Sequence, residues 1–218
     1  MSSHENLQRV LDSGIVAVIR ADSGETLADV AEALLAGGVE VMEVTFTVPD
    51  AVEVIKEVKR RIGDRILLGA GTVLDSETAR TAILAGAEFI VSPSTDVKVI
   101  EMCKRYDKIV TPGVFTPTEV VTAWQAGADI VKVFPADIGG PSHLKALKGP
   151  LPQVKIMPTG GVDLTTAEDF LKAGACALGV GGALVEKDAV ERGDMDRITS
   201  LAKQYVEIVR NFRNQSGD

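Results

Sequence analysis

The chain has 218 residues and a mass of 23.0 kDa, with 45% hydrophobic and 25% charged residues, a composition typical of a globular protein that buries a core. Its 31 acidic and 23 basic residues give a net charge of -8, which argues against a nucleic-acid partner because duplex-binding surfaces concentrate Lys and Arg. Two cysteines, two isolated histidines and the lack of a long apolar run argue against a disulfide framework, a zinc cluster and a membrane partner, and favour a cytoplasmic protein.

Short apolar runs rich in β-branched residues alternate with helical segments along the chain. Each run is nearly continuous in apolar residues, as strands covered on both faces must be. The runs follow one another at intervals of roughly 20 to 26 residues, the period of a βα unit. Eight strands are therefore predicted, and they begin at Ile15, Val39, Arg65, Glu88, Lys108, Asp129, Val154 and Cys176.

The segments between the strands carry helix signals. Thr116 and Glu119 form a predicted capping box around a proline, in which each side chain bonds an amide at the helix start. Helices are also predicted before the first strand and near residues 195–212, and we expect these two helices to close the ends of the fold. His4 is expected in a frayed terminal segment and His143 in a loop.

An internal repeat supports a closed barrel. The segments LLAGGVEVMEV, ILAGAEFIVS, WQAGADIVKVF and LKAGACALGVG each join a helix end to a strand, and they precede alternate strands, as expected of an eightfold barrel made of like units. We therefore predict a (β/α)8 TIM barrel with an additional N-terminal helix, as a single domain over residues 1–218. The alternative is an open, doubly wound sheet, for which the chain lacks a dinucleotide-binding fingerprint after the first strand.

Two ionisable residues interrupt apolar strands at equivalent depth. Lys132 lies in the sixth predicted strand and Glu43 in the second, and these strands lie opposite each other in an eight-stranded barrel. Burial disfavours the charged ammonium, and only the neutral amine attacks a carbonyl carbon. Lys132 therefore suits a Schiff-base nucleophile and Glu43 a proton carrier. The alternative is that the two side chains form a purely structural ion pair.

Further features lie at the carboxyl ends of strands, where barrels build their sites. Arg20 ends the first strand and shares a face with Val16 and Val18, so its guanidinium is expected to bind a carboxylate; an exposed surface arginine is the alternative. Glycine pairs follow the last two strands, at residues 160–161 and 181–182. Backbone amides in such loops can approach a phosphate, although glycines that only relieve tight turns would give the same pattern.

The ordered set of motifs resembles the class I aldolases that cleave 2-keto-3-deoxy-6-phosphogluconate (KDPG) and 4-hydroxy-2-oxoglutarate (KHG). The motifs are GVEVMEVTFTVPDA, GAGTV, EFIVSP, TPGVFTPTE, VKVFPA and PTGGV, and the match extends from IVAVIR to GVGGALV, over more than three quarters of the chain. The resemblance implies a (β/α)8 barrel, usually a homotrimer. It also implies a small 2-keto acid or sugar-phosphate substrate and neither a metal nor an organic cofactor.

Carried over by position, the resemblance makes Lys132 the imine-forming lysine and Glu43 the general acid/base. Many relatives carry an arginine where this chain has Thr47, so binding of the substrate carboxylate is expected to fall to Arg20, with Thr47 beside the substrate. Many also carry a serine at the position of Gly182, so the preference for a phosphorylated substrate stays open. The pyruvyl part is expected at Thr72, Pro93, Phe134 and Thr159, and the phosphate at Gly160, Gly161, Gly181 and Gly182.

The resemblance leaves alternatives open. An aldolase for 2-keto-3-deoxy-6-phosphogalactonate uses the same chemistry on a substrate that differs in configuration at one hydroxyl, which the sequence does not resolve. A non-catalytic sugar-phosphate-binding protein would keep the pocket without the reaction. A metal-using epimerase on the same barrel is disfavoured because the chain lacks clustered histidine ligands.

Overall fold

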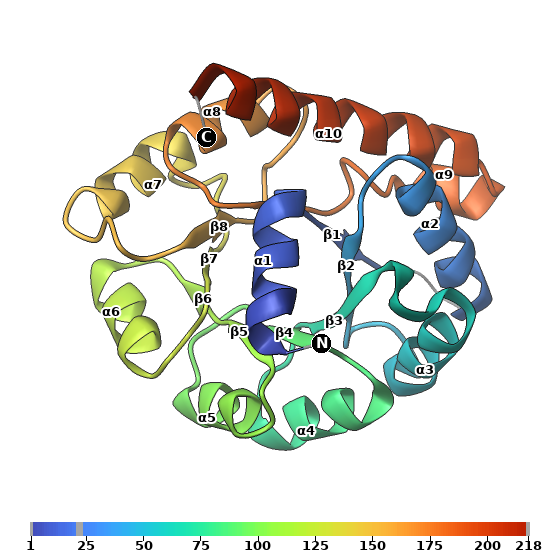
Figure 1. Ribbon diagram of the computed structural model, residues 1–218, viewed down its shortest axis with the longest axis horizontal. Helices are drawn as coiled ribbons and strands as arrows, with labels where there is room; N and C mark the ends of the chain where they lie inside the picture. The colour runs from blue at the N-terminus through green and yellow to red at the C-terminus, as the bar shows by residue number, and fades with distance from the viewer. Residues whose placement is uncertain (1, 21–23, 217–218) are drawn as a thin grey trace.

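The computed structural model describes residues 2–20 and 24–216, and it shows parallel strands inside a ring of helices (Figure 1). Strands and helices alternate along the chain, and each predicted strand region contains an observed strand. The strands are β1 (Ile15–Ile19), β2 (Val41–Thr45), β3 (Leu67–Gly71), β4 (Phe89–Val91), β5 (Ile109–Thr111), β6 (Gly113–Val114), β7 (Val131–Val133), β8 (Ile156–Pro158) and β9 (Leu178–Val180).

The strands close into a barrel through one interrupted strand and one bridge. β5 pairs with β4 and β6 pairs with β7, and only Pro112 separates β5 from β6, so the two segments form one strand of the ring. A parallel bridge between Thr159 and Gly179 joins the end of β8 to β9. The predicted (β/α)8 barrel is therefore confirmed, and the open-sheet alternative is wrong.

Helices connect the strands on the outside of the barrel. The predicted capping box is present at the start of the sixth helix, where the Glu119 carboxylate accepts a hydrogen bond of 2.7 Å from the Thr116 amide. In the described ranges no helix is long and apolar enough to cross a membrane. The connecting helices are α2 (Gly24–Ala36), α3 (Ala51–Ile62) with the 3-10 turn η1 (Gly63–Arg65), α4 (Ser76–Ala85), α5 (Val97–Arg105), α6 (Pro117–Gln125), α7 (Gly140–Lys148), α8 (Ala167–Lys172), α9 (Lys187–Arg192) and α10 (Met195–Ser216).

The C-terminal helix α10 lies in the outer ring, so the expectation that it closes a barrel end is wrong. It runs along the periphery and contacts α2 and α8 (Figure 1). Ala202 of α10 approaches the backbone after α2 so closely that a Cβ atom at Gly37 would collide with it. An amphipathic helix covers the barrel wall and a barrel end equally well, so its apolar pattern does not distinguish the two positions.

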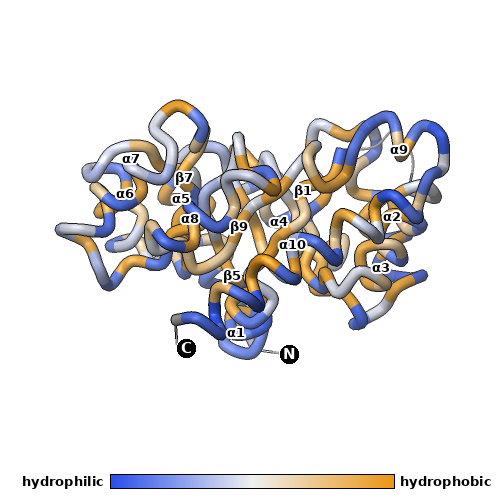
Figure 2. Tube along the Cα trace, turned by 90° about the horizontal axis from the view of Figure 1, so that it is seen from above, coloured by the Kyte–Doolittle hydropathy of each residue, from blue (hydrophilic) through white to orange (hydrophobic). Residues whose placement is uncertain are grey.

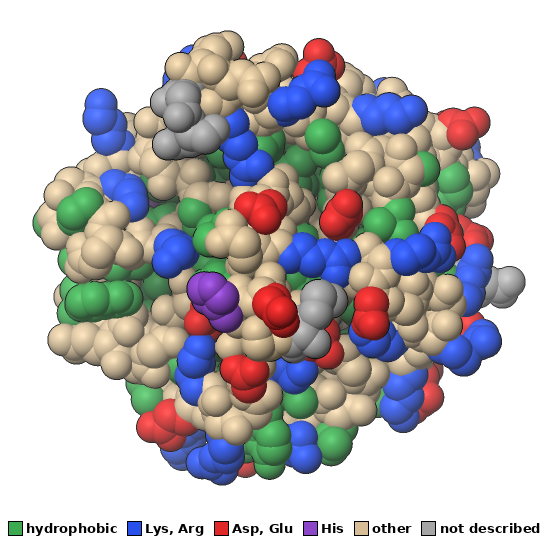
Figure 3. Space-filling view, in the orientation of Figure 1, with side chains coloured by type: hydrophobic (Ala, Val, Ile, Leu, Met, Phe, Trp, Pro, Cys, Tyr) green, Lys and Arg blue, Asp and Glu red, His purple; other side chains and the backbone are tan. Residues whose placement is uncertain are grey.

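The N-terminal helix α1 (Ser3–Ser13) covers the amino-terminal end of the barrel, as predicted. Inward side chains from the first halves of the strands form a separate hydrophobic cluster, and Val10 of α1 is buried against it with Leu7 beside it. Figure 2 shows α1 beneath the strands. Figure 3 shows the same end of the molecule face on, with acidic and basic side chains interspersed.

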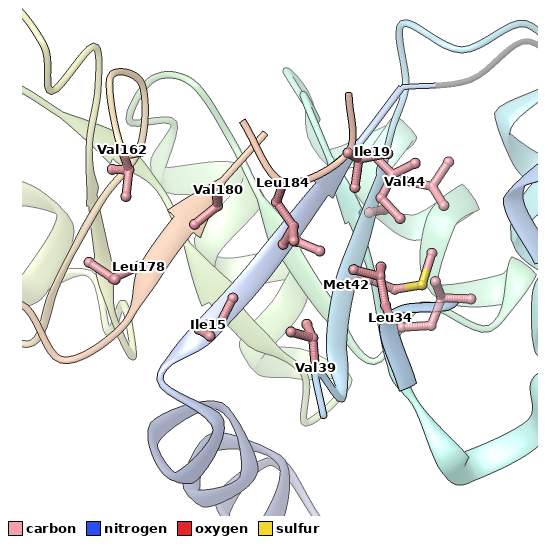
Figure 4. Close-up of a cluster of buried hydrophobic side chains, with 14 of the residues drawn as sticks. Ile15, Ile19, Leu34, Val39, Met42, Val44, Val162, Leu178, Val180 and Leu184 are labelled. Atoms are coloured by element: carbon pink, nitrogen blue, oxygen red, sulfur yellow. The ribbon is translucent and has the colours of Figure 1, made fainter. Parts of the chain in front are cut away.

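The larger hydrophobic core lies between the strands and the helices (Figure 4). Ile15 and Ile19 of β1 point into it with Met42 of β2 and Leu34 of α2, and all four are fully buried. Because side chains alternate along a strand, the residues between these outward positions face the barrel interior. The outer core thereby fixes which residues of β1 and β2 reach the interior.

Both histidines lie in helices, which corrects the frayed segment and the loop expected for them. His4 is part of α1, which begins with a capping box between Ser2 and Glu5. His143 is part of α7, where its Nε2 lies 2.7 Å from the carbonyl oxygen of Phe115 and its ring stacks on the Phe115 ring. The His143 side chain therefore ties α7 to the loop before α6.

Candidate active site

Glu43 and Lys132 enter the barrel from opposite walls. β2 and β7 lie across the ring from each other, and both side chains occupy inward positions. Glu43 pairs in register with Val18 and Gly69, and Lys132 pairs with Gly113. Only 1% of Glu43 and 6% of Lys132 is exposed. The two ionisable groups therefore share the interior of the barrel.

Glycines at inward positions of neighbouring strands make room for these groups. A Cβ atom at Gly71 would lie 2.5 Å from Glu43 Oε1, and one at Gly113 would collide with the backbone of Pro93. The second glycine of the GAGTV motif at residues 69–73, Gly71, therefore leaves room for the Glu43 carboxylate. This role follows from the pairing of β2 with β3, in which Gly71 stands opposite the residue two positions after Glu43.

Burial sets the protonation of both groups. It lowers the pKa of the Lys132 amine, which the Glu43 carboxylate raises in part and the Arg20 charge lowers further. Burial also raises the pKa of Glu43, an effect partly offset by Lys132 and Arg20. In the part of the chain that the structure describes, no ion pair within 4.0 Å joins Glu43 to Lys132, and the buried Glu43 Oε2 accepts no hydrogen bond. These features favour a proton-exchanging pair over a purely structural ion pair.

A cavity of about 730 Å³ opens at the carboxyl ends of β1, β7, β8 and β9. Phe134 lines this cavity, and Lys132 Nζ lies 4.8 Å from the centroid of the Phe134 ring. The cavity therefore adjoins the buried lysine. Thr159 Oγ1 is buried without a hydrogen-bond partner among the described residues. The structure thus brings these predicted site residues together around one cavity: Arg20, Phe134, Thr159, Gly160, Gly161, Gly181 and Gly182.

Five predicted site residues lie outside the lining of this cavity: the buried pair Lys132 and Glu43, and also Thr47, Thr72 and Pro93. Thr72 follows β3 with a φ of 58°, a left-handed conformation that is rare for a β-branched residue. Pro93 follows β4, and its backbone packs against Gly113. Thr47 is exposed after β2, and its hydroxyl lies 2.7 Å from the hydroxyl of Thr45. Thr47, Thr72 and Pro93 follow the ends of β2 to β4, whereas the cavity lies at β1 and β7 to β9.

The glycine pairs lie in loops, at a distance along the chain from the helices that follow them. α8 begins only at Ala167 and α9 only at Lys187. Gly160 has a φ of 91° and Gly161 a φ of 69°, and this left-handed backbone requires glycine. The amides of Gly161 and Gly182 donate no hydrogen bond to the described residues. Any anion bound in these loops would therefore meet backbone amides without the dipole of a helix N-terminus.

Three residues near this site carry no prediction from the sequence. Thr45 is 1% exposed and lies one inward step beyond Glu43, so the alternation along β2 would have identified it. Lys187 and Asp163 line the cavity from the loops that follow β9 and β8. A polar residue in a loop or on a short surface helix has no pattern in the sequence that marks it as a pocket residue.

Cysteines and metal-ligating side chains form no second site in the described ranges. Cys103 and Cys176 are free, and burial raises the pKa of their thiols to about 12 and about 11. Over residues 2–20 and 24–216, no three His, Cys, Asp or Glu side chains are grouped so that they could hold a metal ion.

The chain was compared with known protein families, curated proteins and solved structures. A family model described as KDPG and KHG aldolase matches residues 7–201. A 2-dehydro-3-deoxy-phosphogluconate aldolase of Treponema pallidum is 36% identical over 207 residues, which cover 94% of this chain and 96% of that protein. A KHG/KDPG aldolase of Escherichia coli K12 is 37% identical over 203 residues, which cover 92% of this chain and 94% of that protein.

A solved structure extends the similarity to three dimensions. It is the KDPG aldolase from Legionella pneumophila with pyruvate captured at low pH as a covalent carbinolamine intermediate. The two folds superpose with a TM-score of 0.85 at 31% identity, over 90% of this chain and 96% of that chain. With a family model matched over most of its length and relatives above 30% identity, the chain belongs to the KDPG and KHG aldolase family.

Proposed function

We propose that this protein is a class I aldolase that cleaves KDPG to pyruvate and glyceraldehyde 3-phosphate, and KHG to pyruvate and glyoxylate. The observation that carries the proposal is the buried amine of Lys132, whose pKa is lowered by burial and which faces the carboxyl group of Glu43 across the barrel. The names of the curated relatives and the covalent pyruvate adduct in the Legionella pneumophila structure support the same chemistry here.

In the proposed reaction the uncharged Lys132 amine attacks the C2 ketone of the substrate, and Glu43 protonates the hydroxyl that leaves as water. The resulting protonated imine accepts the electron pair of the C3–C4 bond as that bond breaks. Glu43, directly or through a water molecule, takes the proton of the C4 hydroxyl, and the aldehyde departs. The enamine is then protonated at C3, and hydrolysis of the imine releases pyruvate and the free amine.

The remaining site residues are assigned to binding. Arg20 is the cation proposed for the substrate carboxylate, because Thr47 occupies the place of the arginine found in many relatives and Arg20 lines the cavity. The pyruvyl portion is assigned to Thr72, Pro93, Phe134 and Thr159, and Thr47 to a position beside the substrate. The phosphate is assigned to the backbone amides at Gly160, Gly161, Gly181 and Gly182, since at least two of these amides donate no hydrogen bond to the described residues.

Borohydride trapping tests the proposed function. Sodium borohydride added to the protein with pyruvate reduces a Schiff base to a stable secondary amine, so mass spectrometry of the peptides is expected to show the adduct on Lys132. The Lys132→Ala variant removes the nucleophile and is expected to form no adduct. A wild-type protein that remains unmodified under these conditions would instead be a non-catalytic binding protein.

A homotrimer is the oligomeric state that we propose, on the basis of membership in the family. Size-exclusion chromatography with light scattering is expected to give three times the 23.0 kDa mass of the chain. A monomeric mass across the working concentration range would contradict this assignment without affecting the proposed chemistry.

A further inference from the structure

Two cationic side chains line the cavity, and they come from different parts of the chain. Arg20 ends β1, and Lys187 begins α9 after the last glycine pair. Two acidic side chains also line it. The Asp163 carboxylate is hydrogen-bonded within its own loop, where it accepts bonds from the amide and hydroxyl of Thr165 and from the amide of Thr166. Glu191 lies 3.5 Å from Lys187 one turn along α9.

The loop before α9 places Lys187 beside the proposed phosphate amides. The amides of Leu184 and Val185 both bond the carbonyl oxygen of Gly181, so the chain turns tightly between β9 and α9. Lys187 and the four glycines at residues 160, 161, 181 and 182 line the same cavity. Above Gly182 the space is open, because a Cβ atom there would meet no atom within 4 Å. Gly182 carries no hydroxyl that could contact a phosphate. Lys187 is the nearest lysine or arginine to Gly182 along the chain.

The ion-pair partner of the Lys187 ammonium among the described residues is Glu191. The Lys187 side chain is 83% exposed, and its contact with Glu191 is an exposed pair between residues four apart in a helix. Such pairs are weak and exchange readily for a stronger anion. Arg20 is the cation already assigned to the substrate carboxylate, and its charge perturbs the pKa of both Glu43 and Lys132. Lys187 is therefore the lysine or arginine in the cavity lining that remains for a second anionic group.

We infer that Lys187 is a specificity-determining residue that binds the anionic group at the far end of the substrate and thereby selects phosphorylated over unphosphorylated aldehydes. The inference rests on the proposed function and adds to it a side chain that compensates for the hydroxyl missing at Gly182. The phosphate would be held jointly by the glycine amides and the Lys187 ammonium.

Aldol addition of pyruvate to two aldehydes tests this role. For Lys187→Ala we expect kcat/KM with glyceraldehyde 3-phosphate to fall about tenfold, the size of one lost charge-assisted contact. The kcat/KM with unphosphorylated glyceraldehyde is expected to stay unchanged. Lys187→Arg keeps the charge and is expected to retain most of the preference. The matched control is Lys172→Ala, which removes an exposed lysine that is also paired with a glutamate four residues away but does not line the cavity.

A second variant gives a change in the opposite direction. Glu191→Gln removes a carboxylate from the cavity lining and frees Lys187, so kcat/KM for the phosphorylated aldehyde is expected to rise about two- to threefold, the scale of an exposed charge pair. A Lys187→Ala variant that loses activity equally with both aldehydes, or with neither, would overturn the inference. Pyruvate trapping with borohydride separates this failure from failure of the proposed function, because Lys187 variants must still form the Lys132 adduct if the protein is an aldolase.

Discussion

Lys132 can act as a nucleophile near neutral pH only if a useful fraction of its amine is uncharged. The barrel interior shifts Lys132 toward this condition, since burial lowers the pKa of its amine and the positive charge of Arg20 lowers it further, against an opposing effect of Glu43. The Glu43 carboxyl is buried as well, and its raised pKa lets it hold a proton that an ordinary surface glutamate would release. The two pKa shifts therefore act in the direction that the proposed roles of Lys132 and Glu43 require.

Replacement of the Glu43 carboxyl tests its role directly. Glu43→Gln keeps the shape of the side chain but cannot exchange protons, so we expect kcat for KDPG cleavage to fall by about 10² or more. Steady-state kinetics measures the effect, with circular dichroism to verify folding. Glu88→Gln is the control, because Glu88 is hydrogen-bonded to Asn6 of α1 at the opposite end of the barrel. Turnover near the wild-type rate would reduce Glu43 to a structural residue.

Burial of Lys132 also costs stability, in a way that depends on pH. The pKa of Lys132 in the folded protein lies below its ordinary value of 10.5. Between these two pKa values the unfolded chain binds more protons than the folded protein, so the stability penalty shrinks as the pH rises and disappears above 10.5. We expect Lys132→Met to raise the free energy of unfolding by on the order of 1 kcal/mol at pH 7. Urea denaturation at pH 7 and pH 9.5 should show the gain shrinking with pH. A gain that is the same at both pH values would contradict the lowered pKa.

At the scale of elements, the parallel strands act as a rigid frame that sets which side chains meet. β3 shows this most clearly, because two of its inward positions, Gly69 and Gly71, are glycines and the space they leave is filled from neighbouring strands. Phe89 occupies the space over Gly69, and the Glu43 carboxylate occupies the space over Gly71. The site therefore depends on the absence of side chains at Gly69 and Gly71 as much as on the ionisable residues themselves.

A methyl group at Gly71 should displace the Glu43 carboxylate. A Cβ atom there would lie 2.5 Å from Glu43 Oε1, and the Gly71 backbone is extended, so the cause of the effect is steric. For Gly71→Ala we expect kcat to fall to a level near that of Glu43→Gln, with a destabilisation of about 1–3 kcal/mol from overpacking. Gly149→Ala is the control, because a Cβ atom there meets only ordinary contacts beyond 3.4 Å. Unchanged turnover in Gly71→Ala would show that the carboxylate position is not critical.

At the scale of the whole molecule, the architecture and the two central residues were predictable because both follow from periodic patterns. Apolar runs identified the strands, and the charges of Lys132 and Glu43 stood out because they interrupt such runs. The position of α10 was not predictable, since the same apolar stripe fits two surfaces. His143 was expected in a loop, yet it lies in α7, which begins at Gly140. Lys187 belongs to no pattern that marks a pocket residue, although it follows Gly182 by only five residues.

The plugging of one barrel end by α1 has a practical consequence for handling the protein. The two ends of the described chain lie on the α1 side (Figure 2), where Arg213 of α10 donates hydrogen bonds to the carbonyl oxygens of Leu11 and Asp12. The cavity opens at the other end of the strands. A tag, fusion partner or surface linker attached at either terminus therefore projects away from the substrate entrance, and enzyme immobilised through a terminus keeps that entrance turned toward the solution.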